Sequence, residues 1–287
     1  MTLTINLSRV KNNYLRLKES LPQALIFYAI KANYDKQILK TLSNLDCGAE
    51  VCSEYEYTLA RKAGFKRIMI NGFVKPLKCF MQNAESISQE IRGLRGARMR
   101  IKQDSKVGLS EDEILCCHWD CISFHTSRAR INEWKELLDK AIILSEKTRA
   151  KYINAGGGIN QERINELKKI KKKIIIEPGR ELVENAGELT SKVLAVKGNN
   201  VIISTGINFF NKLSMSKYNI DVVGREQDKR TMTYQVCGPI PTDIDSIGNY
   251  NLPEVKAGDT LRIKNCGAYT LSTANNWTRL KPRIKYD

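Results

Sequence analysis

ALIFYAIKAN, residues 24–33, is a run of seven apolar residues that stops at Lys31. A continuously apolar segment of this length predicts a β-strand buried on both faces, as in a parallel sheet. Similar runs, each followed by small or polar residues, predict strands over residues 48–52, 67–71, 97–101, 121–125, 152–156 and 173–176. Apolar periodicity predicts helices over residues 12–21, 55–63 and 131–148.

This alternation of strands and helices is typical of a (β/α)8 barrel, which we predict over residues 1–190. After about residue 189 the pattern changes to short alternating segments separated by turn residues. That change predicts a C-terminal antiparallel β domain over residues 191–287. Because the active site of such a barrel is built at the C-terminal ends of its strands, the residues at those ends are the functional candidates.

The composition is that of an ordinary globular protein. The chain has 287 residues, 42% of them hydrophobic, and 47 Lys+Arg against 31 Asp+Glu give a net charge of +16. Low-complexity, collagen-like and disordered classes are thereby excluded. No apolar run approaches the ~18 residues of a membrane helix, and the N-terminus lacks the apolar region of a signal peptide. We therefore expect a cytoplasmic protein without a membrane segment, whose eight cysteines stay reduced.

The cluster Cys116-Cys117-His118, followed by Cys121, raises the alternative of a zinc site. Structural zinc sites usually need two spaced pairs of ligands, and His125 is the only other histidine. Small buried thiols before and inside a strand are the favoured interpretation, so no metal is predicted.

The densest basic segment is LKKIKKK, residues 167–173. With the net charge it makes nucleic-acid binding a rival hypothesis, because a positive field concentrates polyanions. No aromatic-interleaved stripe or nucleic-acid motif accompanies these lysines, so a solvated helix end is favoured. The same field would suit a phosphate-bearing or nucleotide-linked substrate.

The predicted strands end at a chemically distinctive set of residues. The set comprises a lysine, an imidazole, a glycine run and a segment with both acid and base: Lys31, His125, Gly156-Gly157-Gly158 and Glu177-Pro178-Gly179-Arg180. Each alone is a weak signal, because a lysine at a strand end is usually a solvated cap and a glycine run is often only a turn. In combination they can hold a phosphorylated aldehyde cofactor, since a glycine run can present its amides to a phosphate.

Segments spread over almost the whole chain resemble one family. They are FYAIKAN (27–33), GAEVCSEYEY (48–57), AESISQEI (84–91), ARMRIK (97–102), SKVG (105–108), NAGGGI (154–159), IIIEPGREL (174–182), CGPIPTDID (237–245) and KNCGAYTLS (264–272). In this order they resemble the fold-type III pyridoxal-phosphate family of ornithine, diaminopimelate and related amino-acid decarboxylases. The resemblance implies an alanine-racemase-like barrel, pyridoxal 5′-phosphate as cofactor, and a lyase that releases an α-carboxylate as CO2.

The resemblance also implies roles for individual residues. Lys31 would bond to the cofactor aldehyde until the substrate amine displaces it. Glu177 would face the pyridine nitrogen and keep the ring protonated, and His125 would stack on the ring. The groups holding the phosphate would be Gly156, Gly157, Gly158, Gly179, Arg180 and Tyr269. Because the family places residues of the C-terminal domain across a dimer interface, a homodimer with shared active sites is implied.

The chain departs from the family pattern shortly after a Gly-Pro pair. Where the family usually has a cysteine and then an acid, this chain has Pro241 and Thr242. That cysteine commonly returns a proton to the substrate carbon, and the acid commonly binds the distal amine of a diamino acid. Asp243 and Asp245 stand nearby as candidate substrate-binding residues. Cys237 is either a relocated thiol or, as we favour, a buried strand cysteine.

A second departure follows His125, where the family usually continues with a hydrophobic residue, glycine and serine. This chain has Thr126-Ser127-Arg128 at those positions. The guanidinium of Arg128 either contacts the substrate or its phosphate, or only caps the next helix, and the sequence favours neither.

The chain is shorter than a usual decarboxylase of this family. Residues 75–84 and 160–173 leave little room for complete helices, which predicts a trimmed barrel. With its trimmed barrel and without the acid, the chain resembles tailoring decarboxylases that act on a tethered amino-acid unit. An example of such a unit is a 3-amino-3-carboxypropyl group on a peptide-nucleotide antibiotic. We also expect the chain to be one part of a longer polypeptide.

Two further alternatives remain. A non-catalytic, cofactor-binding family member is suggested by the missing cysteine, but a binding scaffold has no chemical need for the amine of Lys31. A racemase would need acid–base groups on both faces of the cofactor, and no tyrosine counterpart to Lys31 stands in a matching motif. Glu177 favours the stronger electron sink of a decarboxylase.

Overall fold

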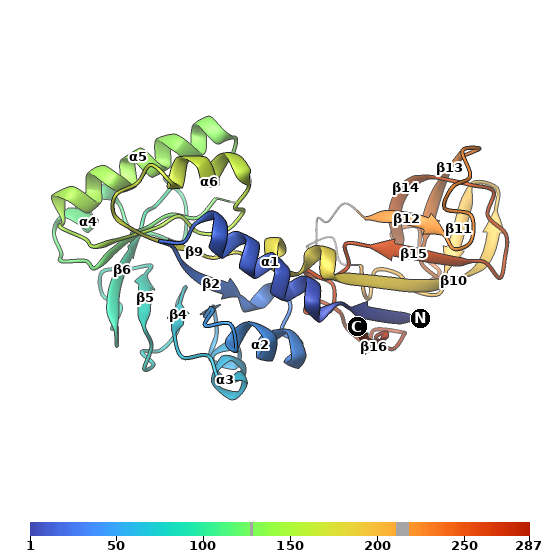
Figure 1. The fold of residues 1–287 in the computed structure, drawn as a ribbon, viewed down its shortest axis with the longest axis horizontal. Coiled ribbons are helices and arrows are strands. Elements are labelled where there is room, and N and C mark those ends of the chain that lie inside the picture. The colour runs from blue at the N-terminus through green and yellow to red at the C-terminus, as the bar shows by residue number, and fades with distance from the viewer. Residues whose placement is uncertain (127–128, 211–217) are drawn as a thin grey trace. The chain divides into compact units, whose positions relative to one another are not determined.

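The computed structural model describes residues 1–126, 129–210 and 218–287. The chain divides into two compact units (Figure 1). The barrel unit comprises Lys11–Leu182, and the sheet unit comprises Met1–Val10 with Val183–Asp287. The boundary that the sequence suggests between residues 190 and 191 lies inside strand β10 and stays a prediction.

Eight parallel strands form the barrel in chain order, and the last strand pairs with the first to close it. Their bounds are β2 (Leu25–Ala29), β3 (Gly48–Val51), β4 (Ile68–Ile70), β5 (Met81–Ala84), β6 (Leu94–Arg98), β7 (Cys121–Ser123), β8 (Tyr152–Asn154) and β9 (Lys173–Ile176). The predicted barrel is confirmed. Strand β5 escaped the sequence analysis, because its polar MQNA segment carries no apolar run.

Helices connect only some of these strands. Their bounds are α1 (Leu7–Ser20), α2 (Lys36–Ser43), α3 (Glu54–Ala63), α4 (Glu111–Leu115), α5 (Ile131–Lys147), α6 (Gln161–Leu167) and α7 (Arg180–Val183), with 3-10 turns at η1 (Ile30–Ala32) and η2 (Glu184–Ala186). No helix stands between β4 and β5 or between β5 and β6, where every residue is described. The expected trimming of the barrel is therefore confirmed, although α6 retains two turns.

Two helix caps fix the chain immediately after the first strands. Asp35 begins α2 by accepting hydrogen bonds from two amides of the first turn. Ser53 begins α3 in the same way, accepting from the Glu56 amide at 3.2 Å. Because these caps hold the starts of α2 and α3, the residues between strand and helix are held at the C-terminal end of the barrel.

Large apolar side chains fill the middle of the barrel. The fully buried cluster consists of Phe27, Met69, Met81, Cys121 and Ile175. Gly48 is required beside it, because a Cβ there would stand 2.4 Å from the Phe27 ring. The barrel is thus packed in its centre, and open space for chemistry remains at its ends.

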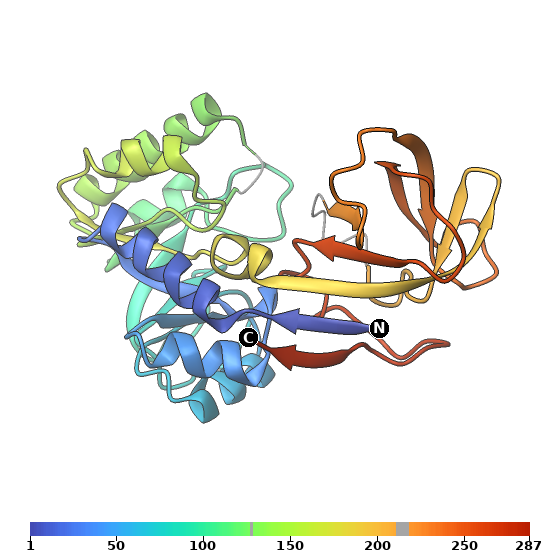
Figure 2. The ribbon, with the colours of Figure 1, turned by 45° about the vertical axis from the view of Figure 1, so that its right-hand side comes forward.

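The sheet unit is built from strands of both ends of the chain. Its strands are β1 (Thr2–Ile5), β10 (Gly187–Lys197), β11 (Asn200–Ile203), β12 (Asn219–Val222), β13 (Met232–Cys237), β14 (Ser246–Leu252), β15 (Thr260–Lys264) and β16 (Arg283–Tyr286). Figure 2 shows the first and last strands side by side, where they pair in parallel. The pairing of β11 with β13 is also parallel, so the predicted antiparallel sheet is in fact mixed.

The helices within the described ranges are all too short or too polar to span a membrane. The cytoplasmic location stays a prediction.

Candidate active site

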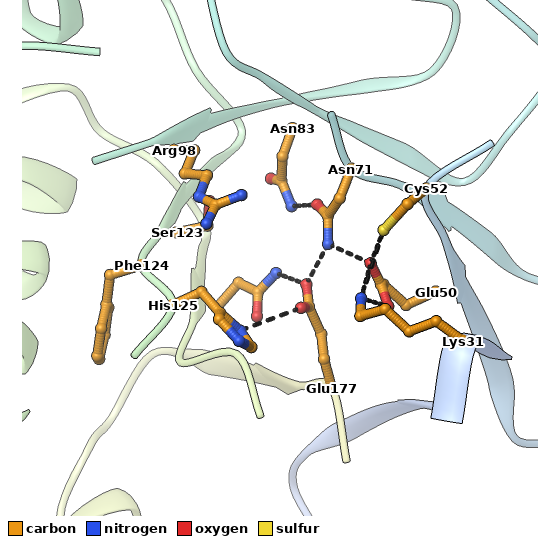
Figure 3. Close-up of a pocket in the computed structure, with 11 residues that line it drawn as sticks. Lys31, Glu50, Cys52, Asn71, Asn83, Arg98, Ser123, Phe124, His125 and Glu177 are labelled. Carbon is orange, nitrogen blue, oxygen red and sulfur yellow. Dashed lines mark hydrogen bonds and ion pairs between the residues drawn. The ribbon is translucent and has the colours of Figure 1, made fainter. Parts of the chain in front are cut away.

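A pocket opens at the C-terminal ends of the barrel strands (Figure 3). Its cavity volume is about 210 Å³. It is lined by Lys31, Glu50, Cys52, Asn71, Asn83, Arg98, Ser123, Phe124, His125, Asn154 and Glu177. The site lies wholly within the barrel unit.

The strand periodicity explains why so many polar side chains meet there. Side chains two positions apart on a strand share a face, so the residue that follows a core residue by two also points into the barrel. The pairs are Met69 and Asn71, Met81 and Asn83, Cys121 and Ser123, and Ile175 and Glu177. The apolar layer is therefore followed by a polar layer, from which the sequence analysis picked out only Glu177.

Lys31 follows strand β2 and faces a buried carboxylate. Its Nζ donates to Glu50 Oε2 at 2.6 Å and Oε1 at 2.9 Å, and it also contacts Cys52 Sγ at 3.4 Å. Burial alone would lower the pKa of Lys31, but the charge and hydrogen bond of Glu50, together with the charges of Cys52 and Glu177, outweigh burial and hold this pKa well above its usual value. Burial likewise opposes the ionisation of Glu50, yet the Lys31 ammonium keeps the pKa of that carboxyl below its usual value.

Glu177 directly follows strand β9. Its Oε1 accepts hydrogen bonds from Asn154 Nδ2 at 2.7 Å and Asn71 Nδ2 at 3.1 Å. Asn71 also donates to Glu50 Oε1 at 2.9 Å and so connects the two carboxylates. Burial, reinforced by the negative charge of Glu50, raises the pKa of Glu177 above its usual value. The two asparagines thus fix the Glu177 carboxylate through Oε1, and neither of them donates a hydrogen bond to Oε2.

His125 stands beside that second oxygen. Its Nδ1 is 3.9 Å from Glu177 Oε2 and accepts a hydrogen bond from the Gly157 amide at 3.3 Å. Burial and the nearby Lys31 charge lower the pKa of His125 to about 4. The imidazole is therefore neutral at physiological pH, which suits a flat packing surface better than a cationic partner.

The glycine run forms a tight loop against this pocket. Gly156 and Gly158 have φ values of +66° and +71°, which glycine adopts without strain. A Cβ on Gly157 would stand 2.7 Å from the carbonyl oxygen of Glu177. The amides of Gly156 and Gly157 already donate within the chain, to Asn154 Oδ1 at 3.0 Å and to His125 Nδ1 at 3.3 Å.

Two charged residues outside the expected set hold this loop. Arg163 donates to the carbonyl oxygens of Gly158 at 2.8 Å and Ala129 at 2.9 Å. Glu181 accepts from the amides of Ile159 at 2.6 Å and Gly179 at 2.9 Å, and so ties the glycine loop to the segment after β9. The Gly179 amide is therefore occupied by the chain itself, and Arg180 begins helix α7 in the same segment.

Arg98 supplies a positive charge to the pocket wall. Its Nη1 lies 3.0 Å from Oε1 of Glu85, whose side chain is buried. The Gly72 amide donates to the same oxygen at 3.2 Å. The sequence did not single out this pair, because Arg98 lies within β6 and Glu85 follows β5, which has no apolar run.

The remaining expected site residues are not described as part of this pocket. Tyr269, Asp243 and Asp245 belong to the sheet unit, where Tyr269 has a φ of +54° and Asp243 is exposed. Asp245 is buried and accepts amide hydrogen bonds from Ile207 at 2.7 Å and Ile240 at 2.8 Å, which favours a structural role. Arg128 lies outside the described residues.

The cysteine cluster does not gather ligands around a common point. Cys121 is buried in β7, whereas Cys116 is exposed and its sulfur lies 3.7 Å from that of Cys117. Across the described part of the chain, no three His, Cys, Asp or Glu side chains are arranged to hold a metal ion.

Comparison with known proteins gives a consistent group of matches. A family model described as "Pyridoxal-dependent decarboxylase, C-terminal sheet domain" matches residues 27–267. The diaminopimelate decarboxylase of Aquifex aeolicus is 26% identical, with 96% of this chain and 83% of the relative covered. That of Helicobacter pylori is 27% identical, with 96% and 87% covered.

Solved structures agree with the fold. A variant of Helicobacter pylori diaminopimelate decarboxylase complexed with L-lysine has a TM-score of 0.86 at 25% identity, covering 99% of this chain and 90% of that one. The Paramecium bursaria Chlorella virus arginine decarboxylase bound to agmatine also scores 0.86, with 100% and 95% covered. At 16% identity, the latter likeness concerns the fold alone.

Proposed function

The chain belongs to the pyridoxal-dependent decarboxylase family, and from that premise we propose that it removes the α-carboxylate, as CO2, from an amino-acid unit attached to a larger molecule. The enzyme is a pyridoxal-phosphate-dependent amino-acid decarboxylase, a lyase. The observation that carries the proposed site is the presence of Lys31 and Glu177 in one pocket, joined through Glu50 and Asn71.

The side chains of this pocket fit the cofactor. Lys31 offers the amine that an aldehyde requires, Glu177 Oε2 can accept from a ring nitrogen, and His125 offers a neutral flat face. The tight turn at Gly156 to Gly158 would approach the phosphate, with Gly179, Arg180 and Tyr269 as further candidate contacts. Bound pyridoxal phosphate supplies a protonated ring that accepts the electron pair left behind when CO2 departs.

The residues of the chain prepare this chemistry in two ways. Glu50 accepts the hydrogen bonds of the Lys31 ammonium, so the lysine has a fixed resting place whenever it is not bonded to a ligand. Glu177 is only 4% exposed, so its negative charge acts across a short distance with little screening by water. A proton on a ring nitrogen facing Glu177 would therefore be retained.

Three features support a tethered substrate. Thr242 stands where the family usually has an acid for a distal amine, and Asp245 is occupied by backbone amides. The trimmed barrel leaves fewer helices around the strands, and the net charge of +16 favours an anionic molecule. The short form and basicity resemble those of the decarboxylase domain of the microcin C maturation enzyme, so a 3-amino-3-carboxypropyl group on a peptide-nucleotide is the proposed substrate.

A free diamino acid is the second candidate, because the matched relatives are diaminopimelate decarboxylases. CO2 release from a nucleotide-linked 3-amino-3-carboxypropyl compound, compared with meso-diaminopimelate, L-ornithine and L-arginine, tests both candidates. We expect kcat/KM to be at least about tenfold higher for the tethered compound, since its remote part adds binding energy. Preference for a free diamino acid would contradict the tethered proposal, and no CO2 from any compound would favour the non-catalytic alternative.

Assembly is a separate part of the proposal. We expect a homodimer with shared active sites, as the family resemblance implies, and light scattering of the holoenzyme should give twice the 32.6 kDa mass of one chain. A monomer that retains full activity would contradict shared sites.

A further inference from the structure

Cys52 is held against the reactive amine of the pocket. Its Sγ donates to Glu50 Oε1 at 3.0 Å and accepts from Lys31 Nζ at 3.4 Å. Its backbone amide donates to Glu56 Oε2 at 2.7 Å, and the next residue, Ser53, caps α3. The thiol is thus fixed from the backbone as well as through its side chain, and Figure 3 shows it pointing toward Lys31 and Glu50.

The reaction requires a proton donor at this place. Decarboxylation breaks the bond between the α-carbon and the carboxylate, and a new bond between the α-carbon and hydrogen replaces it. The substrate amine nitrogen would replace Lys31 Nζ in its bond to the cofactor. The α-carbon is bonded directly to that nitrogen, so it would lie close to the place that Nζ leaves. A group in contact with Lys31 Nζ is therefore close to the carbon that must receive a proton.

Few groups of the pocket can serve. Glu50 and Glu177 accept hydrogen bonds in the structure, and His125 is neutral with its Nδ1 occupied. Burial and the adjacent Glu50 charge raise the pKa of Cys52, so its sulfur carries a proton at neutral pH. Cys52 is therefore a proton-bearing group among the described pocket residues in contact with Lys31. The ammonium of Lys31, once released, is the alternative proton donor.

We propose that Cys52 is a catalytic residue, whose thiol delivers the proton to the substrate α-carbon after CO2 leaves. The S–H bond breaks, the new C–H bond forms with the electron pair left by CO2, and the thiolate then takes a proton from solvent. This assignment supplies a donor in a chain that has Pro241 where the family usually has its cysteine. It rests on the decarboxylase activity and holds whether the substrate is tethered or free.

The first test compares Cys52→Ala with three other variants of the holoenzyme. Cys52→Ser keeps a hydrogen-bonding group of similar size, Cys116→Ala removes an exposed thiol distant in sequence, and Cys237→Ala removes the relocated thiol considered above. CO2, amine product and aldehyde by-product are measured together for each. An aldehyde by-product would indicate that the proton was delivered to a position other than the substrate α-carbon.

We expect Cys52→Ala to lower kcat about 100-fold, as for loss of a general acid, and to raise the share of turnovers that end in aldehyde. Cys52→Ser should partly restore the amine product, and Cys116→Ala should match the wild type. Amine formation by Cys52→Ala within about twofold of wild type would overturn the proposal, as would the same product shift in Cys237→Ala alone.

The second test does not depend on turnover. The raised pKa of Cys52 leaves little reactive thiolate, so maleimide labelling is carried out at pH 9 and followed over time by peptide mapping. Cys52 should be modified slowly in the cofactor-free protein, and this rate should fall at least about tenfold after pyridoxal phosphate is bound and reduced, because the thiol is then covered. Cys116 should label equally in both forms. Equal labelling of Cys52 would contradict its placement, whereas a wild-type protein that releases no CO2 would contradict the proposed function instead.

Discussion

Lys31 and Glu50 form an ion pair at the mouth of the barrel, with Nζ 2.6 Å from Oε2 and the Glu50 side chain only 1% exposed. The pair stabilises the protonated form of the lysine, whereas only the neutral amine can attack an aldehyde. Lys31 Nζ is therefore protonated in the resting state but must be neutral to react. The partner of Glu50 must lose a proton before a cofactor or substrate carbonyl can bond to it.

A pH dependence of cofactor attachment follows from this pair. Below its raised pKa, Lys31 is mostly ammonium, so the neutral fraction and the attachment rate should rise about tenfold for each pH unit. Stopped-flow absorbance of the cofactor-free protein mixed with pyridoxal phosphate, from pH 6 to 9, measures this rate. A rate independent of pH in that window would mean that the amine is already neutral.

Glu50→Gln should shift this profile. Removing the negative charge lowers the pKa of Lys31, so attachment at pH 7 should become faster, by about tenfold for each unit that the pKa falls. The exposed Glu54→Gln is the control and should leave the profile unchanged. Slower attachment by Glu50→Gln at pH 7 would show that position, and not charge, is what Glu50 contributes.

Glu177→Gln should separate charge from hydrogen bonding at the other end of the site. The amide oxygen can still accept from Asn71 and Asn154, so the melting temperature should stay close to that of the wild type. The lost negative charge should lower kcat by roughly 100- to 1,000-fold, the size seen when one electrostatic group is removed from an active site. A kcat within threefold of wild type would exclude the proposed role of Glu177 at the ring nitrogen.

Gly157→Ala should affect both stability and cofactor binding. The new Cβ would meet the carbonyl oxygen of Glu177 at 2.7 Å, and accommodation should cost about 1–3 kcal/mol of unfolding free energy. Gly198→Ala, in an open turn at a φ of +58°, should also lower stability but leave cofactor affinity unchanged. Equal cofactor affinity in the two variants would show that the glycine loop does not contribute to cofactor binding.

Much of the barrel was predictable, because parallel strands buried on both faces have continuously apolar sequences. The segments ending at Lys31, His125 and Glu177 were found in this way, and the C-terminal strand ends were the correct place to look. Strand β5 was missed since its MQNA segment contains no continuous apolar run, although Met81 lies in the core. A search for polar residues two positions after each apolar core residue would have found Asn71 and Asn83 as well.

Other features could not be read from local patterns. Strand β1 pairs with β10, and β16 pairs with β1, so the sheet unit joins segments from opposite ends of the chain. The role of Arg163 depends on carbonyls that its own helix does not contain. Such long-range pairing is decided by tertiary packing, which propensity and periodicity do not encode.

Borohydride reduction of the protein with bound pyridoxal phosphate, followed by peptide mass mapping, tests the central assignment most directly. The Lys31–Glu50–Glu177 site predicts one reduced cofactor adduct on the peptide containing Lys31, and no adduct in Lys31→Ala. An adduct on another lysine, such as one in the basic segment 167–173, or no adduct at all, would contradict the assignment of this pocket as the cofactor site.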